Sequence, residues 1–324
     1  MTDRVLAEQM RPASLDSLIG QDATVHSVQT QLASGRIPHL FIIYGPSGSG
    51  KTTLAKILAE TLLQGKNDTN APSSSRQSRQ SRSANLREIN AANHNGVDDV
   101  RALIESMRFR PLPPCPAKVV ILDEAHKLTD PAQNALLTAT EDAAGHVYYI
   151  FCTTAFTKLL PALRRRTFVV SPTPLTPEHV RALVQSAADI VGTSNTNTNT
   201  NTKDNNTEAY EPLLEALEAY EVTSPGLVLQ ATERYFTGIS AQDAVLVTHT
   251  DNTSLNTMAV ARAVCAGNWK ACSAALRETD MTKADAYPVK ICVLGYLRKA
   301  LLNTPNGQKA TALADAITGI AGQP

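Results

Sequence analysis

Residues 39–58, HLFIIYGPSGSGKTTLAKIL, place a short apolar run, a glycine-rich segment and a helical pattern in direct succession. The apolar run at 39–45 predicts a buried strand, and a helix is expected from about Thr52 to Leu63. Between them, GPSGSGKT matches the phosphate-binding pattern G-x-x-x-x-G-K-[ST] in the strand-to-helix context that this motif requires. A chance glycine-rich turn is the alternative, and the flanking strand and helix together argue against it.

Residues of this loop have separate expected tasks. Backbone N–H groups turn inward to hold phosphate oxygens, and the helix N-terminus adds its dipole. Lys51 is expected to reach the β- and γ-phosphates, and Thr52 to offer a hydroxyl to Mg²⁺. The sequence therefore predicts ATP and Mg²⁺ as cofactors, with the binding residues Gly45, Pro46, Ser47, Gly48, Ser49, Gly50, Lys51, Thr52 and Thr53.

An acid pair follows a second apolar run further along the chain. KVVILDE, residues 118–124, predicts another buried strand with Asp123 and Glu124 at its carboxyl end. Ligands bind at that end of the strands in open α/β sheets. We expect Asp123 to be a Mg²⁺ ligand and Glu124 to orient and deprotonate an attacking water.

Short apolar runs alternate with helical stretches up to about residue 171. Further strands are expected at 147–154 and 167–171, and helices at 97–108 and from Pro131 to about Glu141. Such alternation predicts an α/β fold with a parallel sheet covered on both faces. The run at 147–154 ends on two threonines, which either hydrogen-bond the γ-phosphate or water, or only cap the strand.

The strand pattern stops at the proline-rich segment PTPLTP, residues 172–177, which predicts a domain boundary. The stretches after it read as helical. Helices are expected at 178–191, 208–220, 225–236, 241–249, 257–266, 269–278, 286–302 and 308–320.

Two polar stretches are predicted to be solvated loops. Residues 64–83 are rich in serine and arginine, and residues 192–207 form an Asn/Thr tract of low complexity. Neither can offset its ordering entropy by burying apolar surface. Contact of the first stretch with phosphate is the alternative.

Composition excludes several classes of protein. Hydrophobic residues make up 43% of the chain, enough for packed cores, and 30 basic residues balance 30 acidic ones, so no overall basic field predicts a nucleic-acid partner. The five cysteines form no C-x-x-C pair, which argues against a disulfide framework or zinc site. The sequence contains no run of 18 apolar residues, so no membrane-spanning helix is predicted. We therefore expect a soluble intracellular protein.

With these residues in view, the chain resembles the AAA+ clamp-loader ATPases over most of its length. RPASLDSLIGQ, residues 11–21, is similar to the family box that packs around adenine, which implies cofactor binding by Arg11 and Pro12. DEAHKLT at 123–129 and TTAFTKL at 153–159 are also similar to family segments. The second of these implies that Thr154 is the residue that senses the γ-phosphate.

A basic segment carries the most specific resemblance. LPALRRRT, residues 160–167, is similar to the family pattern P-x-L-x-S-R-C, whose arginine enters the ATP site of the next subunit. Alignment on the proline and leucine implies that Arg166 has this role. The chain has Arg-Arg-Thr where the family has Ser-Arg-Cys, so Arg165 and Arg164 are alternatives, as is a basic surface turn without function.

Two departures from the family change what is expected. Motor subunits of bacterial clamp loaders carry four zinc-binding cysteines where this chain has its Ser/Arg stretch, so no zinc is expected. The lid of motor subunits also carries a sensor-2 arginine, whereas SPGLVL at 224–229 looks more like the stator subunits. The combination implies ATP binding with weakened or differently arranged hydrolysis.

The resemblance implies an AAA+ P-loop domain at 1–174, a helical lid at 175–238 and a helical collar for oligomerisation at 239–324. It further implies a pentamer of clamp-loader subunits that opens a sliding clamp and places it on primer–template DNA in DNA replication. Arg101 and Lys127 either contact the DNA backbone or are solvated helix charges. The expected location is the cytoplasm of a bacterial or virus-infected cell, or a nucleus, without secretion or membrane contact.

Two other functions remain open from the sequence. A different AAA+ DNA motor, for branch migration or helicase loading, shares these motifs but usually ends in a basic winged-helix domain, which residues 241–324 do not resemble. A stator subunit that binds ATP without hydrolysing it is the second alternative. Neither a homo-oligomer nor a mixed assembly is favoured.

Overall fold

A computed structural model describes residues 5–34, 36–65, 76–141, 145–194 and 207–251, with scattered residues between Ala263 and Thr318. The chain forms two compact units, which are described separately. The sheet unit comprises residues 7–179 and 224–226, and the helical unit comprises residues 1–6, 180–223 and those from 227 onward. Within the described part, no helix combines the length and apolar character that crossing a membrane requires.

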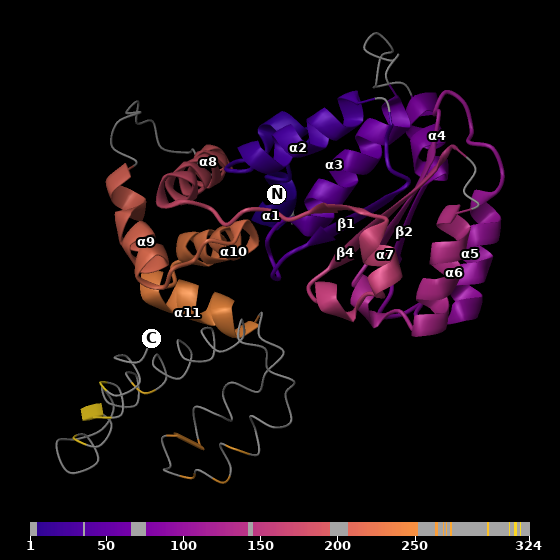
Figure 1. Ribbon diagram of the computed structural model, residues 1–324. Coiled ribbons are helices and arrows are strands. Elements are labelled where there is room, and N and C mark those ends of the chain that lie inside the picture. The colour runs from indigo at the N-terminus through magenta and orange to yellow at the C-terminus, as the bar shows by residue number, and fades with distance from the viewer. Residues whose placement is uncertain are drawn as a thin grey trace. The chain divides into compact units, whose positions relative to one another are not determined.

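A parallel sheet of five strands, in the order β2-β3-β4-β1-β5, forms the centre of the sheet unit (Figure 1). Its strands confirm the four predicted ones and add β2. Because all strands run in the same direction, their carboxyl ends lie at one edge, where ligands bind in such sheets. The strands are β1 Leu40–Tyr44, β2 Leu86–Asn90, β3 Lys118–Asp123, β4 Val147–Thr153 and β5 Phe168–Val170.

Strand residues alternate between two apolar cores, one on each face of the sheet. Phe41 and Ile43 pack with α3 (Lys51–Gln64) and α2 (Asp22–Ala33). Leu40 and Ile42 pack on the opposite face with α5 (Val97–Met107), α6 (Asp130–Glu141) and α7 (Pro161–Arg165). Burying each such side chain contributes about 1.5–3 kcal/mol. Both faces of the sheet are therefore covered by helices, as predicted, and the packed cores fix the positions of the strand ends.

Helices begin and end where the local sequence favours it. α3 follows Gly50, whose φ is 89°, and ends before Gly65, whose N–H donates to the carbonyl of Thr61 at 3.3 Å. Glycine is the residue that adopts positive φ without strain. Short elements complete the sheet unit: α1 Leu6–Gln9, η1 Leu15–Ser17, η2 Ala125–Lys127 and η3 Phe156–Lys158.

The prediction of a loop at 64–83 is wrong from residue 76 onward, because α4 is a helix from Arg76 to Asn85. Asn85 is fully buried, and its side chain exchanges two hydrogen bonds of 2.9 Å with the backbone N–H and carbonyl of Leu112. Arg82 forms an ion pair with Glu60 at 3.3 Å. These partners come from distant segments, so composition did not predict the helix. Residues 66–75 lie outside the described part.

Four helices of the helical unit confirm those predicted at 178–191, 208–220, 225–236 and 241–249. They are α8 Pro177–Ser194, α9 Thr207–Ala219, α10 Pro225–Phe236 and α11 Ala241–Asp251. Within this unit, Arg181 of α8 forms an ion pair with Glu211 of α9 at 3.0 Å, and α9 packs against α11.

Of the helices predicted after residue 251, only scattered residues are described, and those that fall within the predicted ranges are helical. The loop predicted at 192–207 is wrong at both ends, because residues 192–194 belong to α8 and Thr207 to α9; residues 195–206 lie outside the described part. The division into domains at 174/175 and 238/239 stays a prediction. The sheet unit extends to residue 179, and most of the predicted collar falls on residues that are not described.

Candidate nucleotide-binding site

The glycine-rich loop joins β1 to α3 at the carboxyl edge of the sheet. Gly48 and Gly50 have φ values of 75° and 89°, which side chains rarely allow. A Cβ on Gly45 would lie 2.9 Å from the hydroxyl of Ser49. The predicted glycines are therefore required by the turn, and the loop ends at the helix N-terminus, where backbone N–H groups favour an anion.

The hydroxyl of Ser49 gives this loop a test of fit for a ligand. Its oxygen is buried and has no hydrogen-bond partner among the described residues. Buried polar atoms are almost always paired in folded proteins. An oxygen-rich group such as a phosphate next to the loop would supply the missing partner, so the loop fits a nucleotide.

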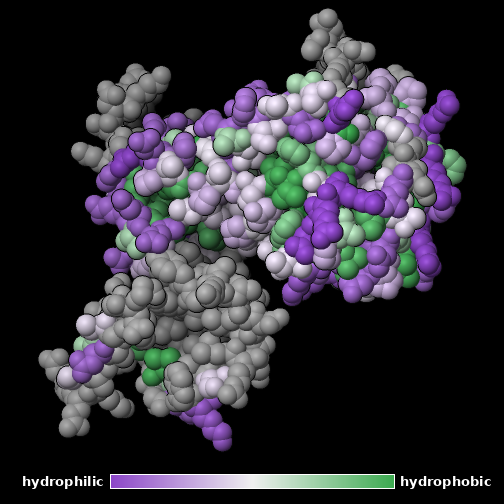
Figure 2. Space-filling view, in the orientation of Figure 1, coloured by the Kyte–Doolittle hydropathy of each residue, from purple (hydrophilic) through white to green (hydrophobic). Residues whose placement is uncertain are grey.

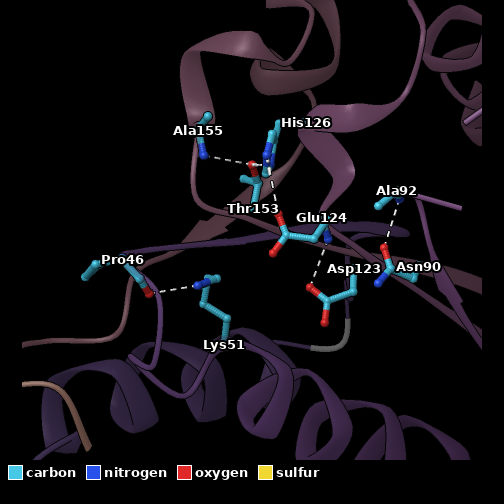
Figure 3. Close-up of polar contacts among 9 residues, drawn as sticks. All are labelled: Pro46, Lys51, Asn90, Ala92, Asp123, Glu124, His126, Thr153 and Ala155. Carbon is cyan, nitrogen blue, oxygen red and sulfur yellow. Dashed lines mark hydrogen bonds and ion pairs between the residues drawn. The ribbon is translucent and has the colours of Figure 1, made fainter. Parts of the chain in front are cut away.

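Lys51 is the buried cation of the site. Its side chain donates to the carbonyl of Pro46 at 2.8 Å, and the residue is only 7% exposed (Figure 3). Burial lowers the pKa of its ammonium group, while Glu124, Cys152 and Asp123 act in the opposite direction. An ammonium has three donors, and the bond to Pro46 uses one. Two donors thus remain for further oxygen atoms, and contact of Lys51 with the β- and γ-phosphates stays a prediction.

Thr52 and Asp123, the two predicted Mg²⁺ ligands, lie next to each other. The hydroxyl of Thr52, in the first turn of α3 with Thr53, donates to Asp123 Oδ2 at 2.9 Å. The other carboxylate oxygen of Asp123 accepts the N–H of Glu124 at 2.9 Å. Hydroxyl and carboxylate oxygens are the ligands that Mg²⁺ prefers. The pair therefore fits a magnesium ion beside the phosphate loop.

Glu124 leaves the end of β3 in an unusual backbone conformation. Its φ is 52°, in the left-handed region that costs a residue with a Cβ about 1–2 kcal/mol. The turn directs its side chain into the space between Lys51 and His126, as Figure 3 shows. Glu124 Oε2 lies 3.3 Å from Nε2 of His126. Strained residues of this kind are concentrated at functional sites.

The end of β4 places Thr153, rather than Thr154, next to His126, which lies beside Glu124. Thr153 is 1% exposed, and its hydroxyl lies 3.2 Å from Nδ1 of His126. Thr154, which the resemblance implied as the sensor, is exposed. Because β4 is buried along almost its whole length, no alternation in its sequence distinguishes the two threonines. Sequence reasoning also missed His126, although it follows the acid pair by only two positions.

The S-P-G segment, residues 224–226, contacts the phosphate loop within the sheet unit. The N–H of Gly226 donates to the carbonyl of Gly48 at 2.9 Å, and Ser224 Oγ donates to the carbonyl of Ser47 at 3.3 Å. A Cβ on Gly226 would lie 2.9 Å from that carbonyl oxygen and 3.0 Å from Gly48 Cα. Glycine is therefore needed at position 226 for this approach.

Gly226→Ala should weaken ATP binding, because the added methyl group pushes Gly48 out of place. Overpacking costs about 1–3 kcal/mol of folding free energy. If about 1.4 kcal/mol of this cost falls on the ATP-binding conformation of the loop, the Kd for ATP rises roughly tenfold. Binding of a fluorescent ATP analogue measures the effect. Gly145→Ala is the matched control, since a Cβ there meets nothing within 4 Å. Equal Kd values for both variants would contradict the argument.

The three arginines of the basic segment have different surroundings. The guanidinium of Arg164 lies over the ring of Phe156 at 5.4 Å, while Arg165 is exposed. Arg166 is exposed and forms an ion pair with Glu141 of the same chain. Figure 2 shows strongly hydrophilic side chains gathered on the surface where α7 lies. Of the three, Arg166 and Arg165 are accessible to a neighbouring molecule.

The predicted adenine box is anchored to the sheet unit through Gln21. Its side chain donates to the carbonyl of Thr173 at 2.7 Å and accepts the N–H of the same residue at 2.8 Å. Arg11 is exposed and Pro12 is half-buried. Their binding to adenine stays a prediction.

The two predicted DNA contacts are both exposed. Arg101 lies on α5, where it forms an ion pair with Asp98 at 3.4 Å, and Lys127 is the last residue of η2. Their role in DNA binding stays a prediction.

Comparison with known proteins agrees with the clamp-loader resemblance. Residues 20–176 match the family model described as DNA polymerase III, delta subunit. The DNA polymerase III subunit gamma/tau of Mycobacterium bovis is 36% identical over 185 residues, which is 55% of this chain and 32% of that protein. The replication factor C small subunit of Thermoplasma acidophilum is 31% identical, over 57% of this chain and 53% of that protein. The chain thus matches about a third to a half of the length of these relatives.

Solved structures support the fold. The Holliday junction branch migration motor RuvB of Thermotoga maritima superposes with a TM-score of 0.55 and 18% identity, covering 93% of this chain and 94% of that one. Identity this low shows a shared fold alone. The predicted α/β fold with a parallel sheet is confirmed, and the sequence similarity to clamp-loader subunits agrees with the predicted relationship.

Proposed function

We propose that this AAA+ relative of the DNA polymerase III and replication factor C clamp-loader subunits is an ATPase subunit of a clamp loader in DNA replication. One observation supports the ATPase activity most directly. Lys51 and Thr52 of α3 converge with Asp123 and Glu124 at the end of β3 at one edge of the sheet, and Thr52 and Asp123 are in contact at 2.9 Å. The names of the relatives support the role in replication.

Each residue of the site has a task in this proposal. Bound ATP supplies the phosphoryl group, and Mg²⁺ neutralises charge on its β- and γ-oxygens. The loop N–H groups and Lys51 bind the phosphates, and Thr52 and Asp123 would hold the Mg²⁺ ion. Glu124 orients the attacking water and accepts its proton.

A neighbouring subunit would complete the site. Arg166 is exposed, so its side chain could enter the ATP site of the next subunit. There its guanidinium would neutralise the charge that develops on the transferred phosphoryl group. Hydrolysis would then depend on assembly, in the pentamer that the resemblance implies. Arg101 and Lys127 are proposed as contacts to the backbone of primer–template DNA, in the cytoplasm or nucleus where replication takes place.

The test is ATP turnover of the purified chain with its partner subunits, with and without a sliding clamp and primer–template DNA. We expect the clamp and DNA together to raise turnover several-fold, and Lys51→Ala to abolish both ATP binding and turnover. ATP binding without any turnover would instead identify a stator. Stimulation by a four-way junction, but not by primer–template DNA, would identify a branch-migration motor.

A further inference from the structure

His126 connects the proposed general base to the tip of the neighbouring strand. Its Nε2 lies 3.3 Å from Glu124 Oε2, and its Nδ1 lies 3.2 Å from Thr153 Oγ1 (Figure 3). The side chain of His126 is only 8% exposed, so most of the imidazole is removed from solvent. The imidazole thus bridges the residue that follows β3 and the last residue of β4.

The hydrogen bonds around this imidazole have one consistent direction. Thr153 Oγ1 accepts the N–H of Ala155 at 3.0 Å, which leaves its own hydroxyl proton free to be donated. Burial lowers the pKa of His126, against a smaller opposing effect of Glu124, and so favours the neutral imidazole. A neutral imidazole has one donor and one acceptor. Nδ1 then accepts from Thr153, and Nε2–H faces Oε2 of Glu124 at 3.3 Å.

This arrangement restrains a carboxylate that the backbone alone does not fix. Glu124 follows the last residue of β3 with a positive φ, and its side chain is 38% exposed. A general base must lie within hydrogen-bond reach of the proton that it removes, and small displacements reduce the rate strongly. A neutral imidazole that is fixed by its hydrogen bond to Thr153 and lies 3.3 Å from the carboxylate restrains that group without neutralising its charge.

We propose that His126 is a positioning residue for ATP hydrolysis, which orients the carboxylate of Glu124 and couples it to the hydroxyl of Thr153 at the end of β4. The proposal rests on the ATPase function proposed above. It assigns the catalytic contact to Glu124 and gives His126 no contact with the nucleotide. It also gives Thr153 a task that sequence resemblance assigned to Thr154.

The test compares His126→Ala, His126→Gln and His126→Asn in the full chain with its partner subunits. We expect His126→Ala to lower kcat about 10- to 100-fold, with KM and the Kd for an ATP analogue changed by less than about twofold. The amide nitrogen of glutamine extends about as far from Cβ as Nε2, so His126→Gln should restore most of kcat. Asparagine extends only as far as Nδ1, so His126→Asn should not.

Controls separate failure of this inference from failure of the proposed function. His94→Ala removes an exposed histidine, whose side chain is 61% exposed, and should leave kcat unchanged. If the wild-type complex shows no ATP turnover, the proposed function fails. If the wild type is active and His126→Ala keeps its kcat, or gains in kcat, the positioning role is overturned.

A last comparison covers the case in which His126→Ala does not fold. The Gln and Asn variants fill most of the same space, and thermal unfolding checks that both are folded. Equal kcat values for these two folded variants would also overturn the inference. Thr153→Val should lower kcat in the wild-type background and have a smaller effect in His126→Gln, because residues in one network are not additive.

Discussion

Arg166→Ala should lower ATP turnover of the assembled complex by about 10³- to 10⁵-fold at the sites that this chain completes, the range found for arginine fingers in other NTPases. The isolated variant should bind ATP like the wild type, because Arg166 does not belong to its own phosphate loop. Turnover of the complex and binding of an ATP analogue to the single chain measure the two effects.

The ion pair with Glu141 presents little obstacle to this role. Arg166 and Glu141 are 56% and 46% exposed, and a surface pair of this kind contributes about 0–1 kcal/mol. A rate factor of about 10³–10⁵ corresponds to roughly 4–7 kcal/mol, so contact with a triphosphate is the stronger interaction. Glu141→Gln should therefore change turnover by less than about fivefold.

Arg165→Ala is the matched control, because it removes a neighbouring exposed guanidinium. We expect it to retain most of the turnover. A large loss with Arg165→Ala and none with Arg166→Ala would move the function to Arg165, the alternative that the sequence left open. No loss with either variant would contradict a finger in this segment.

Glu124→Gln should lower turnover by about 10²- to 10⁴-fold, the range of general base catalysis, while ATP binding is retained. Glutamine keeps the shape of the side chain and can still accept the N–H of His126, but it cannot take a proton from water. The phosphate loop, Lys51 and Thr52 are unchanged. Turnover and ATP-analogue binding, measured on the same preparation, separate the two effects.

Glu88→Gln controls for the loss of a carboxylate elsewhere in the sheet unit. Glu88 forms an ion pair with Lys56 at 3.0 Å, and its side chain is 42% exposed. This variant should keep wild-type turnover. If Glu124→Gln also kept it, hydrolysis would not depend on the acid pair, and the catalytic role of Glu124 would be wrong.

Much of the fold could be predicted because three of the strands are unbroken apolar runs in the sequence. β1, β3 and β4 are buried on both faces, so no polar residue interrupts them until the strand ends. β2 has no such run: LREIN is half-buried or exposed at every position of the edge strand. β2 is a strand because it pairs with β3, and the local pattern of apolar residues does not predict that pairing.

The same distinction applies to the site. Spacing in the motif was sufficient to place Lys51 and Thr52, because the loop and helix are contiguous in sequence. The acid pair was predicted from its place at the end of a buried strand. The contact of His126 with Thr153 was not predicted, since the two residues are 27 positions apart and only the pairing of β3 with β4 brings them within 3.2 Å.

The amino-acid order by itself determined the phosphate loop, the buried strands and the acid pair, because each depends on residues a few positions apart. Tertiary structure alone decided which threonine faces the site, what restrains Glu124 and why polar residues 76–85 form a helix. Those outcomes depend on hydrogen bonds between segments distant along the chain. Such partners are fixed by how the strands pair and how the helices pack, which no local pattern contains.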